Sequence, residues 1–403
     1  MKILHIGNLG PTKFPTGGII HVDESIKLET LEGHISEWVS IRPQREIYAI
    51  KSKNHLRLNL QPDYPLTIFP DYYAGLYVAD NNRALSFVQN KLESFEPDVV
   101  VYEGPWMWTL VQKLKPRLKF KFREIYSCHN IESTLLSRIY LEDKQSDFSV
   151  AIASRFLTKL EMEMSQCCDA VVTLTKDDSM AIGKFAPKKI IQASNGANAN
   201  PPSNFSKLMS RLRRDLNSCR FIFISSNWAP HVDGLHNLIR VLEVSNALHD
   251  VELTVVGSIH ESFQNYHRNR IYKIGSKISI RFTGRVGSKK LSSLQHSSHG
   301  YFLPIQYGGG KGIKASEALL SGKTIVATTA AFRGFDLNTL PNNVFIEPDY
   351  EAFADKLLNL KANELVLNTV ATVQSDYSWE SVLKPWIEYL RNLQPNDTTS
   401  HME

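Results

Sequence analysis

The sequence is poor in cysteine and lacks long apolar runs, and both absences limit what the chain can be. Only four of its 403 residues are cysteine, two of these are adjacent, and none forms a Cys-x-x-Cys pair. Such a set fits free thiols in a reducing compartment better than a disulfide framework or a zinc site. No stretch approaches the ~18 uncharged apolar residues that a membrane-spanning helix needs. We therefore expect no transmembrane segment.

Several signature motifs are absent as well. There is no Asp-x-Asp and no cluster of His and Cys at metal-ligand spacing, so a metal-dependent transfer centre is not expected. The missing Gly-x-Ser-x-Gly motif removes the usual hydrolase signature. The opening residues, MKILHIGNLG, lack the apolar core and cleavage site of a signal peptide, and none is expected.

The composition is that of a globular protein with a mild positive charge. Apolar residues make up 42% and charged residues 22% of the chain, which is typical of soluble proteins. A chain of 403 residues is too long for one ordinary core, so two domains of roughly 150–200 residues are expected. The net charge of +5 permits an anionic ligand or membrane surface but does not require nucleic acid, which we do not expect as a partner.

Strands and helices alternate along the chain, which is typical of parallel βαβ units. A stretch rich in Asn, Ser and Pro at 184–208 predicts the linker between two such sets. The fold class is therefore α/β, with two doubly wound, Rossmann-like domains in tandem that face each other across an interdomain cleft. The expected strands are 2–7, 98–102, 123–129, 169–175, 220–225, 251–257, 278–284, 300–305 and 324–328, and the clearest helices are 17–34 and 147–168.

One strand end carries the glycine-rich segment YGGGKGIKASEAL, which opens a helix. Glycine lets backbone N–H groups approach an anion, and the helix adds its partial positive N-terminus. The spacing is not that of a Walker loop. The candidate phosphate ligands are Gly308, Gly309 and Gly310.

Charged side chains in the same segment extend this hypothesis. Lys311 and Lys314 are placed to form charge-assisted bonds with a diphosphate. Glu317 follows Lys314 by one helical turn, and its carboxylate suits sugar or ribose hydroxyls better than phosphate. The alternative is an ordinary glycine-rich loop with a Lys–Glu pair on the helix surface.

Three other strand ends carry candidate residues. GPTKFPTGG, at 10–18, is a second glycine site, although it lacks Gly-x-Gly-x-x-Gly and an ordinary turn is the alternative. CHNIE places His129 and Asn130 after a strand, where a histidine can bind a hydroxyl or transfer a proton; a buried structural histidine is the alternative. YEGPWMW offers Glu103 with Trp106 for a sugar or acyl face, against an aromatic helix start packed into the core.

The segment KLKPRLKFKFR, at 113–123, has a basic residue at every second position. If the segment is extended, one edge is cationic and the other apolar, which suits an anionic membrane surface or a lipid diphosphate. The alternative is a solvated loop and strand edge.

Four segments in this order carry a family resemblance: MKILHIGNLGPTKFPTGGIIHV; CHNIE with KLEMEMSQCCDAVVTLTKDD; FIFISSNWAPHVDGLHNLI; and, most specific, LPIQYGGGKGIKASEALLSGKTIVAT. Together they resemble the two-domain, retaining glycosyltransferases of the GT-B type, close to family 4. The likeness covers about residues 1–35 and 98–390, and DYSWESVLKPWIEYL resembles the family's C-terminal helix that crosses back to the first domain.

The resemblance implies transfer of a sugar from a nucleotide diphosphate sugar, UDP- or GDP-linked, to a glycan or lipid-linked acceptor. The transfer would proceed with retention and without a metal or cofactor. The implied domains are an acceptor-binding domain at 1–196, a donor-binding domain at 197–375, and a crossover helix and tail at 376–403.

The resemblance also implies roles for single residues. Gly17 and Gly18 would face the donor diphosphate. The expected catalytic residues are His129 beside the transferred sugar, Lys314 on phosphate and Glu317 on the ribose. The further donor-binding residues are Ser226, Asn227, Gly308, Gly309, Gly310 and Lys311, and the acceptor-binding residues are Glu103, Trp106 and Asn130.

The chain departs from the family pattern at three places. Gly309 stands where the family has a carboxylate for the donor sugar. Ser226, Asn227 and His231 stand where it has an Arg and Lys pair, and Gly312 replaces an arginine. These departures affect the residues that bind the donor.

Two other functions fit the same fold. A nucleotide-sugar epimerase would need acid and base groups around the second sugar carbon, and the strand-end loops hold few carboxylates. A non-catalytic nucleotide-sugar-binding partner subunit is favoured by Gly309 and the missing arginine. We expect a cytoplasmic protein of polysaccharide or glycolipid biosynthesis, and the basic stretch leaves open a peripheral contact with the inner face of the membrane.

Overall fold

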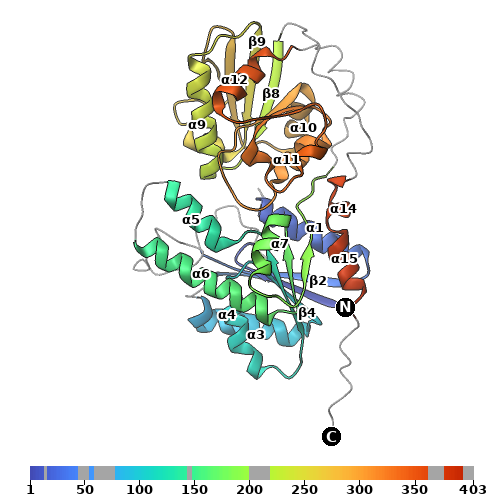
Figure 1. Ribbon diagram of the computed structural model, residues 1–403. Helices are drawn as coiled ribbons and strands as arrows, with labels where there is room; N and C mark the ends of the chain where they lie inside the picture. Colours follow the sequence, from blue (N-terminus) through green and yellow to red (C-terminus); the bar gives the residue numbers. More distant parts are fainter. Residues whose placement is uncertain are drawn as a thin grey trace. The chain divides into compact units, whose positions relative to one another are not determined.

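The computed structural model describes residues 1–12, 16–43, 54–58, 78–142, 148–198, 218–361 and 376–393. The chain divides into two compact units, which are drawn in Figure 1 and described here one at a time. Unit 1 comprises Met1–Ser194 and Val382–Glu403, and unit 2 comprises Asn195–Ser381. The last segment of the chain thus returns to the unit in which the chain begins.

The described part of unit 1 contains one sheet of seven strands, in the order β3-β2-β1-β4-β5-β6-β7. All neighbouring strands are parallel. The central strands are almost continuously apolar and buried, because helices cover both faces of a parallel sheet. The strands are β1 Lys2–Gly7, β2 Ile35–Pro43, β3 His55–Leu58, β4 Val99–Glu103, β5 Arg123–Cys128, β6 Ala170–Thr173 and β7 Ile190–Gln192.

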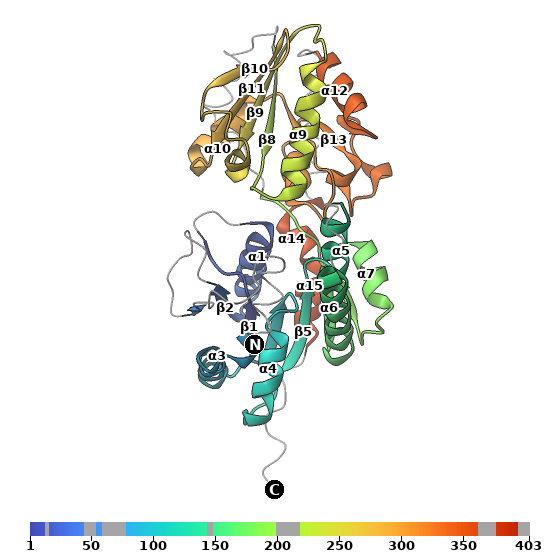
Figure 2. The same ribbon diagram turned by 90° about the vertical axis from the view of Figure 1, so that its left-hand side faces the viewer.

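The helices of unit 1 form two layers. One core cluster joins the sheet to α3, α4, α6 and α7, and a smaller one joins Ile19 and Val22 of α1 to Trp38 of β2. Figure 2 shows α1 on one side of the strands and α5 and α6 on the other. The helices are α1 Gly17–Leu31, α3 Asn82–Phe95, α4 Trp108–Leu114, η1 Lys115–Arg117, α5 Glu132–Glu142, α6 Phe148–Cys167, α7 Lys176–Gly183 and α15 Lys384–Arg391.

Unit 2 repeats this architecture. Seven strands of its described residues form a sheet in the order β10-β11-β9-β8-β12-β13-β14, in which β10 is antiparallel to β11 and the other pairs are parallel. The strands are β8 Ser218–Ile224, β9 Asp250–Val256, β10 Ile271–Lys273, β11 Ile278–Gly284, β12 Gly300–Leu303, β13 Thr324–Thr328 and β14 Val344–Glu347.

The helices α9 and α12 lie together on one side of the strands of unit 2, and α10 and α11 lie on the other (Figures 1 and 2). Helix α9 approaches the end of β12 closely at Gly234, where a Cβ atom would lie 1.7 Å from the carbonyl oxygen of Pro304. The helices are α9 Ala229–Glu243, η2 Ser258–Ser262, α10 Ser288–Ser297, α11 Ile313–Leu320, η3 Thr329–Phe332, η4 Leu337–Thr339, α12 Tyr350–Asn359 and, at the end of this unit, α14 Trp379–Val382.

The expected α/β class is confirmed, and each strand expected from an apolar run is present within a few residues. The strands that the sequence analysis did not identify are the short β3, β7, β10 and β14 and the half-polar β2. The stretch assigned to a linker contains β7 in its first half, and its residues 199–208 lie outside the described part.

The C-terminal segment is two helices rather than one. Helix α14 ends at Val382 and α15 begins at Lys384. Pro385 in the first turn of α15 has no backbone N–H, so it cannot continue the hydrogen bonds of α14.

Of the two interpretations of the basic stretch 113–123, the structure agrees with the loop and strand edge and not with an extended amphipathic segment. The stretch comprises the end of α4, η1, a loop and the first residue of β5. Lys113 pairs with Asp80, Lys115 pairs with Glu124, and Phe122 is buried. The apolar residues therefore pack into unit 1 instead of forming an exposed apolar edge.

Candidate active site

The glycine-rich loop of unit 2 joins β12 to α11. Gly308 and Gly310 have positive φ angles of 153° and 59°, which side chains rarely adopt. The loop is braced from two directions, since Arg333 Nε donates to the carbonyl of Gly309 (2.8 Å) and Asn195 Nδ2 donates to that of Lys311 (2.7 Å). Gly308 and Gly310 are therefore needed for the backbone path of the loop, independently of any ligand.

Helix α11 starts directly after this loop, with Lys314 and Glu317 in its first two turns. The residue that caps the helix is Gly312, and no side chain bonds to the first N–H groups. Burial lowers the pKa of Lys314, and the nearby Glu317 opposes this; burial raises the pKa of Glu317, and Lys314 opposes it. Within the described residues neither side chain has a hydrogen-bond or ion-pair partner. A desolvated cation and carboxylate without partners mark this helix end as a ligand-binding candidate.

Arg333, which the sequence analysis missed, belongs to the same site. Besides its bond to Gly309, it donates from Nη1 to the carbonyl of Ala330 (2.8 Å). A Cβ atom on Gly308 would lie 2.8 Å from its Cζ atom. The pKa of His231 lies well below its usual range. Burial is the largest cause, and the positive charges of Lys314 and Arg333 lower it further. A positive cluster therefore forms next to the glycine loop, although the arginine comes from a segment after β13.

The other donor-binding candidates of unit 2 are already engaged. The ammonium of Lys311 lies 4.4 Å from the ring centre of Phe335 and 5.5 Å from that of Tyr377, and burial lowers its pKa to about 8. The Asn227 side-chain oxygen accepts from Ser262 Oγ (2.5 Å), and the Ser226 carbonyl accepts from Ser225 Oγ (3.0 Å). Lys311 is therefore held by aromatic rings, unlike Lys314.

In unit 1, Gly17 and Gly18 are the first residues of α1, and residues 13–15 of the preceding segment lie outside the described part. A Cβ atom on Gly18 would lie 3.2 Å from Leu9 Cδ1, a tight contact. Thr16 precedes the helix without a side-chain capping bond.

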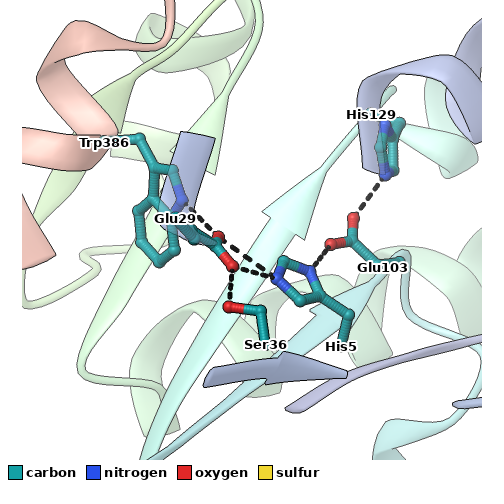
Figure 3. Close-up of polar contacts among 6 residues, drawn as sticks. All are labelled: His5, Glu29, Ser36, Glu103, His129 and Trp386. Carbon is teal, nitrogen blue, oxygen red and sulfur yellow. Dashed lines mark hydrogen bonds and ion pairs between the residues drawn. The ribbon is translucent and has the colours of Figure 1, made fainter. Parts of the chain in front are cut away.

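His129 lies after β5, at the end of a buried polar network that we call the His5 network (Figure 3). His129 Nε2 and His5 Nδ1 each lie 2.6 Å from a different oxygen of Glu103. His5 Nε2 lies 3.0 Å from Glu29 Oε2 on its other side. The network is completed by two more donors to Glu29, which are Ser36 Oγ (2.6 Å) and Trp386 Nε1 (2.8 Å).

The network is ionised at its centre. Burial alone would lower the pKa of His5, but the carboxylates of Glu29 and Glu103 outweigh it and raise that pKa to about 10. Burial alone would raise the pKa of Glu103, but the hydrogen bonds from His129 and His5 hold it well below its usual range. His5 is therefore an imidazolium between two carboxylates.

The structure gives Glu103 partners that the sequence analysis did not predict. Glu103 is only 5% exposed, and each of its oxygens accepts a hydrogen bond from a histidine. Trp106 packs against the core of unit 1. Asn130 donates from Nδ2 to Glu132 Oε1 at 3.4 Å. The histidine and the carboxylate that the sequence analysis placed in separate roles form one pair.

Two further observations concern the described residues only. They contain no group of three or more His, Cys, Asp or Glu residues arranged to hold a metal ion. None of their helices is both long and apolar enough to span a membrane.

Comparison with known proteins covers both units. Residues 218–363 match the family model described as glycosyl transferases group 1. No curated protein sequence matches the chain.

Several solved structures share the fold over nearly the whole chain. The sucrose-phosphate synthase of Thermosynechococcus elongatus has a TM-score of 0.67 at 14% identity, covering 97% of this chain and 98% of its own. The E. coli trehalose-6-phosphate protein bound with UDP-2-fluoro glucose has a TM-score of 0.61 at 11% identity, covering 98% and 100%. The catalytic domain of Arabidopsis thaliana starch synthase IV, bound to ADP and acarbose, has a TM-score of 0.59 at 14% identity, covering 96% and 98%.

The resemblance that the sequence motifs indicated is thereby confirmed. The matched family region includes the glycine loop, Lys314, Glu317 and Arg333. Residues 218–363 match the glycosyl transferases group 1 model, and the chain has the two-domain GT-B fold of the solved structures that it resembles.

Proposed function

We propose that the protein transfers a sugar from a nucleotide diphosphate sugar to a glycan or lipid-linked acceptor, with retention and without a metal. The observation that carries the proposal is the pair Lys314 and Glu317, which stands without partners in the described residues after a glycine loop. This pair lies inside the matched glycosyltransferase domain. Two of the similar structures, from E. coli and Arabidopsis, were solved with UDP-2-fluoro glucose and ADP.

Unit 2 supplies the chemistry for the donor in this proposal. The bond between the sugar carbon and the diphosphate oxygen breaks, and negative charge develops on the leaving diphosphate. Lys314, Arg333 and the N-terminal N–H groups of α11 stabilise that charge, and because they are fixed before the reaction they lower the barrier electrostatically. Glu317 accepts hydrogen bonds from the ribose hydroxyls.

The acceptor step needs no paired carboxylates of the glycosidase kind. The acceptor oxygen forms its bond to the sugar carbon on the face from which the diphosphate departs, and its proton passes to a departing phosphate oxygen. His129 of unit 1 contacts a hydroxyl of the transferred sugar. The donor is UDP- or GDP-linked, and a cytoplasmic location with contact to the inner membrane face stays a prediction.

Calorimetry with UDP-glucose, GDP-mannose and the free diphosphates, followed by donor-hydrolysis and transfer assays, tests the proposal. Binding of a nucleotide sugar with release of the diphosphate supports a transferase. Binding without hydrolysis or transfer to any acceptor supports the second candidate, a non-catalytic binding subunit, which is favoured by the absence of a side chain at Gly309. No binding of any nucleotide contradicts both.

A further inference from the structure

The His5 network buries charged side chains inside unit 1, at positions that apolar residues could fill in the same fold. Its members come from β1, α1, β2, β4, the segment after β5, and α15, so it joins several strands of the sheet to α1 and α15 (Figure 3). His5, Glu29 and Glu103 are each at most 5% exposed. Burying ions is costly unless their hydrogen bonds are satisfied, and a well-packed apolar cluster is often at least as stable. The arrangement therefore points to a positioning role.

The network is not itself a ligand pocket. The cavity beside it has a volume of about 10 Å3 and is lined by residues that include His5, Glu103 and Trp386. That is room for no more than about one water molecule. A function of the network must be exerted through a member that reaches the surface.

Two members are partly exposed, Ser36 and His129, and of these only His129, whose side chain is 13% exposed, has a ring nitrogen without a partner in the described structure. Glu103 is ionised and can only accept, so the Nε2 atom of His129 must carry the proton that it donates. Its Nδ1 atom is itself buried and has no hydrogen-bond partner in the described structure. When the imidazole is neutral and Nε2 carries the proton, this atom is an acceptor. The ring edge of His21, 5.1 Å away between ring centres, supports the imidazole from another side.

The remaining members fix Glu103 in turn. Both of its oxygens are occupied, one by His129 and one by His5. His5 is held on its far side by Glu29, and Glu29 by the indole N–H of Trp386. Trp386 belongs to α15, so the C-terminal helix completes a chain of hydrogen bonds that ends at His129.

We propose that Glu103, His5, Glu29 and Trp386 are positioning residues that hold His129 with Nε2–H on Glu103 and Nδ1 toward a hydroxyl of the donor sugar. The contact between His129 Nδ1 and the sugar hydroxyl rests on the proposed function. The orientation of the His129 ring by the network does not rest on it, and it is tested without a ligand.

The ligand-free test is proton NMR of the intact chain. Buried imidazole N–H protons that are hydrogen-bonded exchange slowly and resonate apart from the amides; the His5 and His129 signals are assigned by their loss in His5→Gln and His129→Ala. Glu103→Gln offers one acceptor oxygen to two N–H donors, so at least one of the two signals disappears. If both signals persist in Glu103→Gln, the network does not orient His129 and the proposal is overturned.

The ligand test measures the ratio of the Kd for UDP to that for UDP-glucose, or of GDP to GDP-mannose, because this ratio isolates the contribution of the sugar. Removing one hydrogen bond to the sugar lowers it about 3- to 10-fold, which we expect for His129→Ala and for Glu103→Gln. Trp386→Phe keeps an aromatic ring but removes the donor to Glu29, and we expect a loss of about twofold. Glu124→Gln is the matched control, since Glu124 is equally buried but lies at the start of β5 and contacts neither histidine of the network.

A double-mutant cycle separates positioning from general destabilisation. If Glu103 and Trp386 act through His129, their substitutions change the ratio by less than about 1.5-fold in the His129→Ala background. An undiminished effect in that background overturns the positioning role. If His129→Ala alone leaves the ratio unchanged, the sugar contact of the proposed function is wrong, and the NMR result still decides whether the network orients the ring.

Discussion

The two units treat buried charge in opposite ways. In unit 1, His5 lies between Glu29 and Glu103, and every charge at the centre of the network faces an opposite one. In unit 2, the described structure offers Lys314 and Glu317 no hydrogen-bonded partner, and burial shifts both of their pKa values toward the neutral forms. Since a charge without hydrogen-bond partners is costly in a folded protein, the first arrangement is complete by itself. The second is the one for which we propose a ligand.

The largest effect is expected from breaking the complete arrangement. His5→Leu removes the cation between two buried carboxylates, so that Glu29 and Glu103 lose their shared counter-ion and one side of their hydrogen bonding, and it destabilises unit 1 by about 3–5 kcal/mol. Urea unfolding followed by circular dichroism measures this loss. His231→Leu is the matched control in unit 2, because the partners of this buried histidine, Ser225 and the Ser226 backbone, are neutral, and it should cost about 1–2 kcal/mol. Equal losses in the two variants would contradict the contrast between the units.

The incomplete arrangement is tested by ligand affinity. Lys314→Ala removes a charge-assisted bond to the diphosphate and should weaken binding of UDP or GDP about 10- to 100-fold by calorimetry. Lys290→Ala, at an exposed position of α10, serves as control and should leave the affinity unchanged. An unaltered Kd in the Lys314 variant would show that this lysine does not bind the diphosphate.

The contrast also predicts a pH dependence of stability. The pKa of His5 is raised from 6.5 to about 10 in the folded protein, so its contribution is fully present below pH 6.5 and is lost as the pH rises toward 10. Glu103 has a lowered pKa, so its contribution is present above 4.5 and is lost in acid. The stability difference between wild type and His5→Leu should therefore shrink from pH 6.5 to 10. A difference that stays constant over this range would show that His5 is not charged by its neighbours.

The next prediction concerns Arg333, which braces the glycine loop of unit 2. Arg333→Lys keeps the charge but loses the planar fork that binds the carbonyls of Gly309 and Ala330. We expect nucleoside diphosphate affinity to fall about 3- to 10-fold in calorimetry, because the glycine loop is no longer braced. Gly308→Ala should act in the same direction, since its Cβ atom would collide with the Arg333 guanidinium at an unfavourable positive φ. If both variants bind like wild type, the brace has no role in binding.

The smallest effect is expected at the surface of unit 1. Lys119 and Lys121 are exposed, but the apolar residues between and beside them pack inward. Only their charge is left to attract an anionic membrane, and it is screened at physiological salt. Reversing both charges should change sedimentation with phosphatidylserine vesicles less than about twofold at 0.15 M salt. A severalfold loss of vesicle binding would restore the membrane contact as a feature of this protein.

Much of the fold follows from local patterns. The buried strands β1, β4 and β8 are short apolar runs, and α6 has helical periodicity over its whole length, so the α/β class and the tandem arrangement are predictable from neighbouring residues. The short strands β7, β10 and β14 were not predictable, because three or four residues of mixed polarity become a strand only by pairing with a sheet that already exists.

The sequence by itself determined the glycine loop, the start of α11 with Lys314 and Glu317, and the place of His129 after a strand, because each depends on residues that are adjacent in the chain. Only the tertiary structure decided which groups share a site. Arg333 reaches Gly309 from a segment 24 positions away, and Trp386 reaches Glu29 across 357 positions. Glu103 lies between His5 and His129 because β1 and β5 lie on either side of β4 in the sheet. Such neighbours are set by strand order and helix packing, which no local spacing encodes.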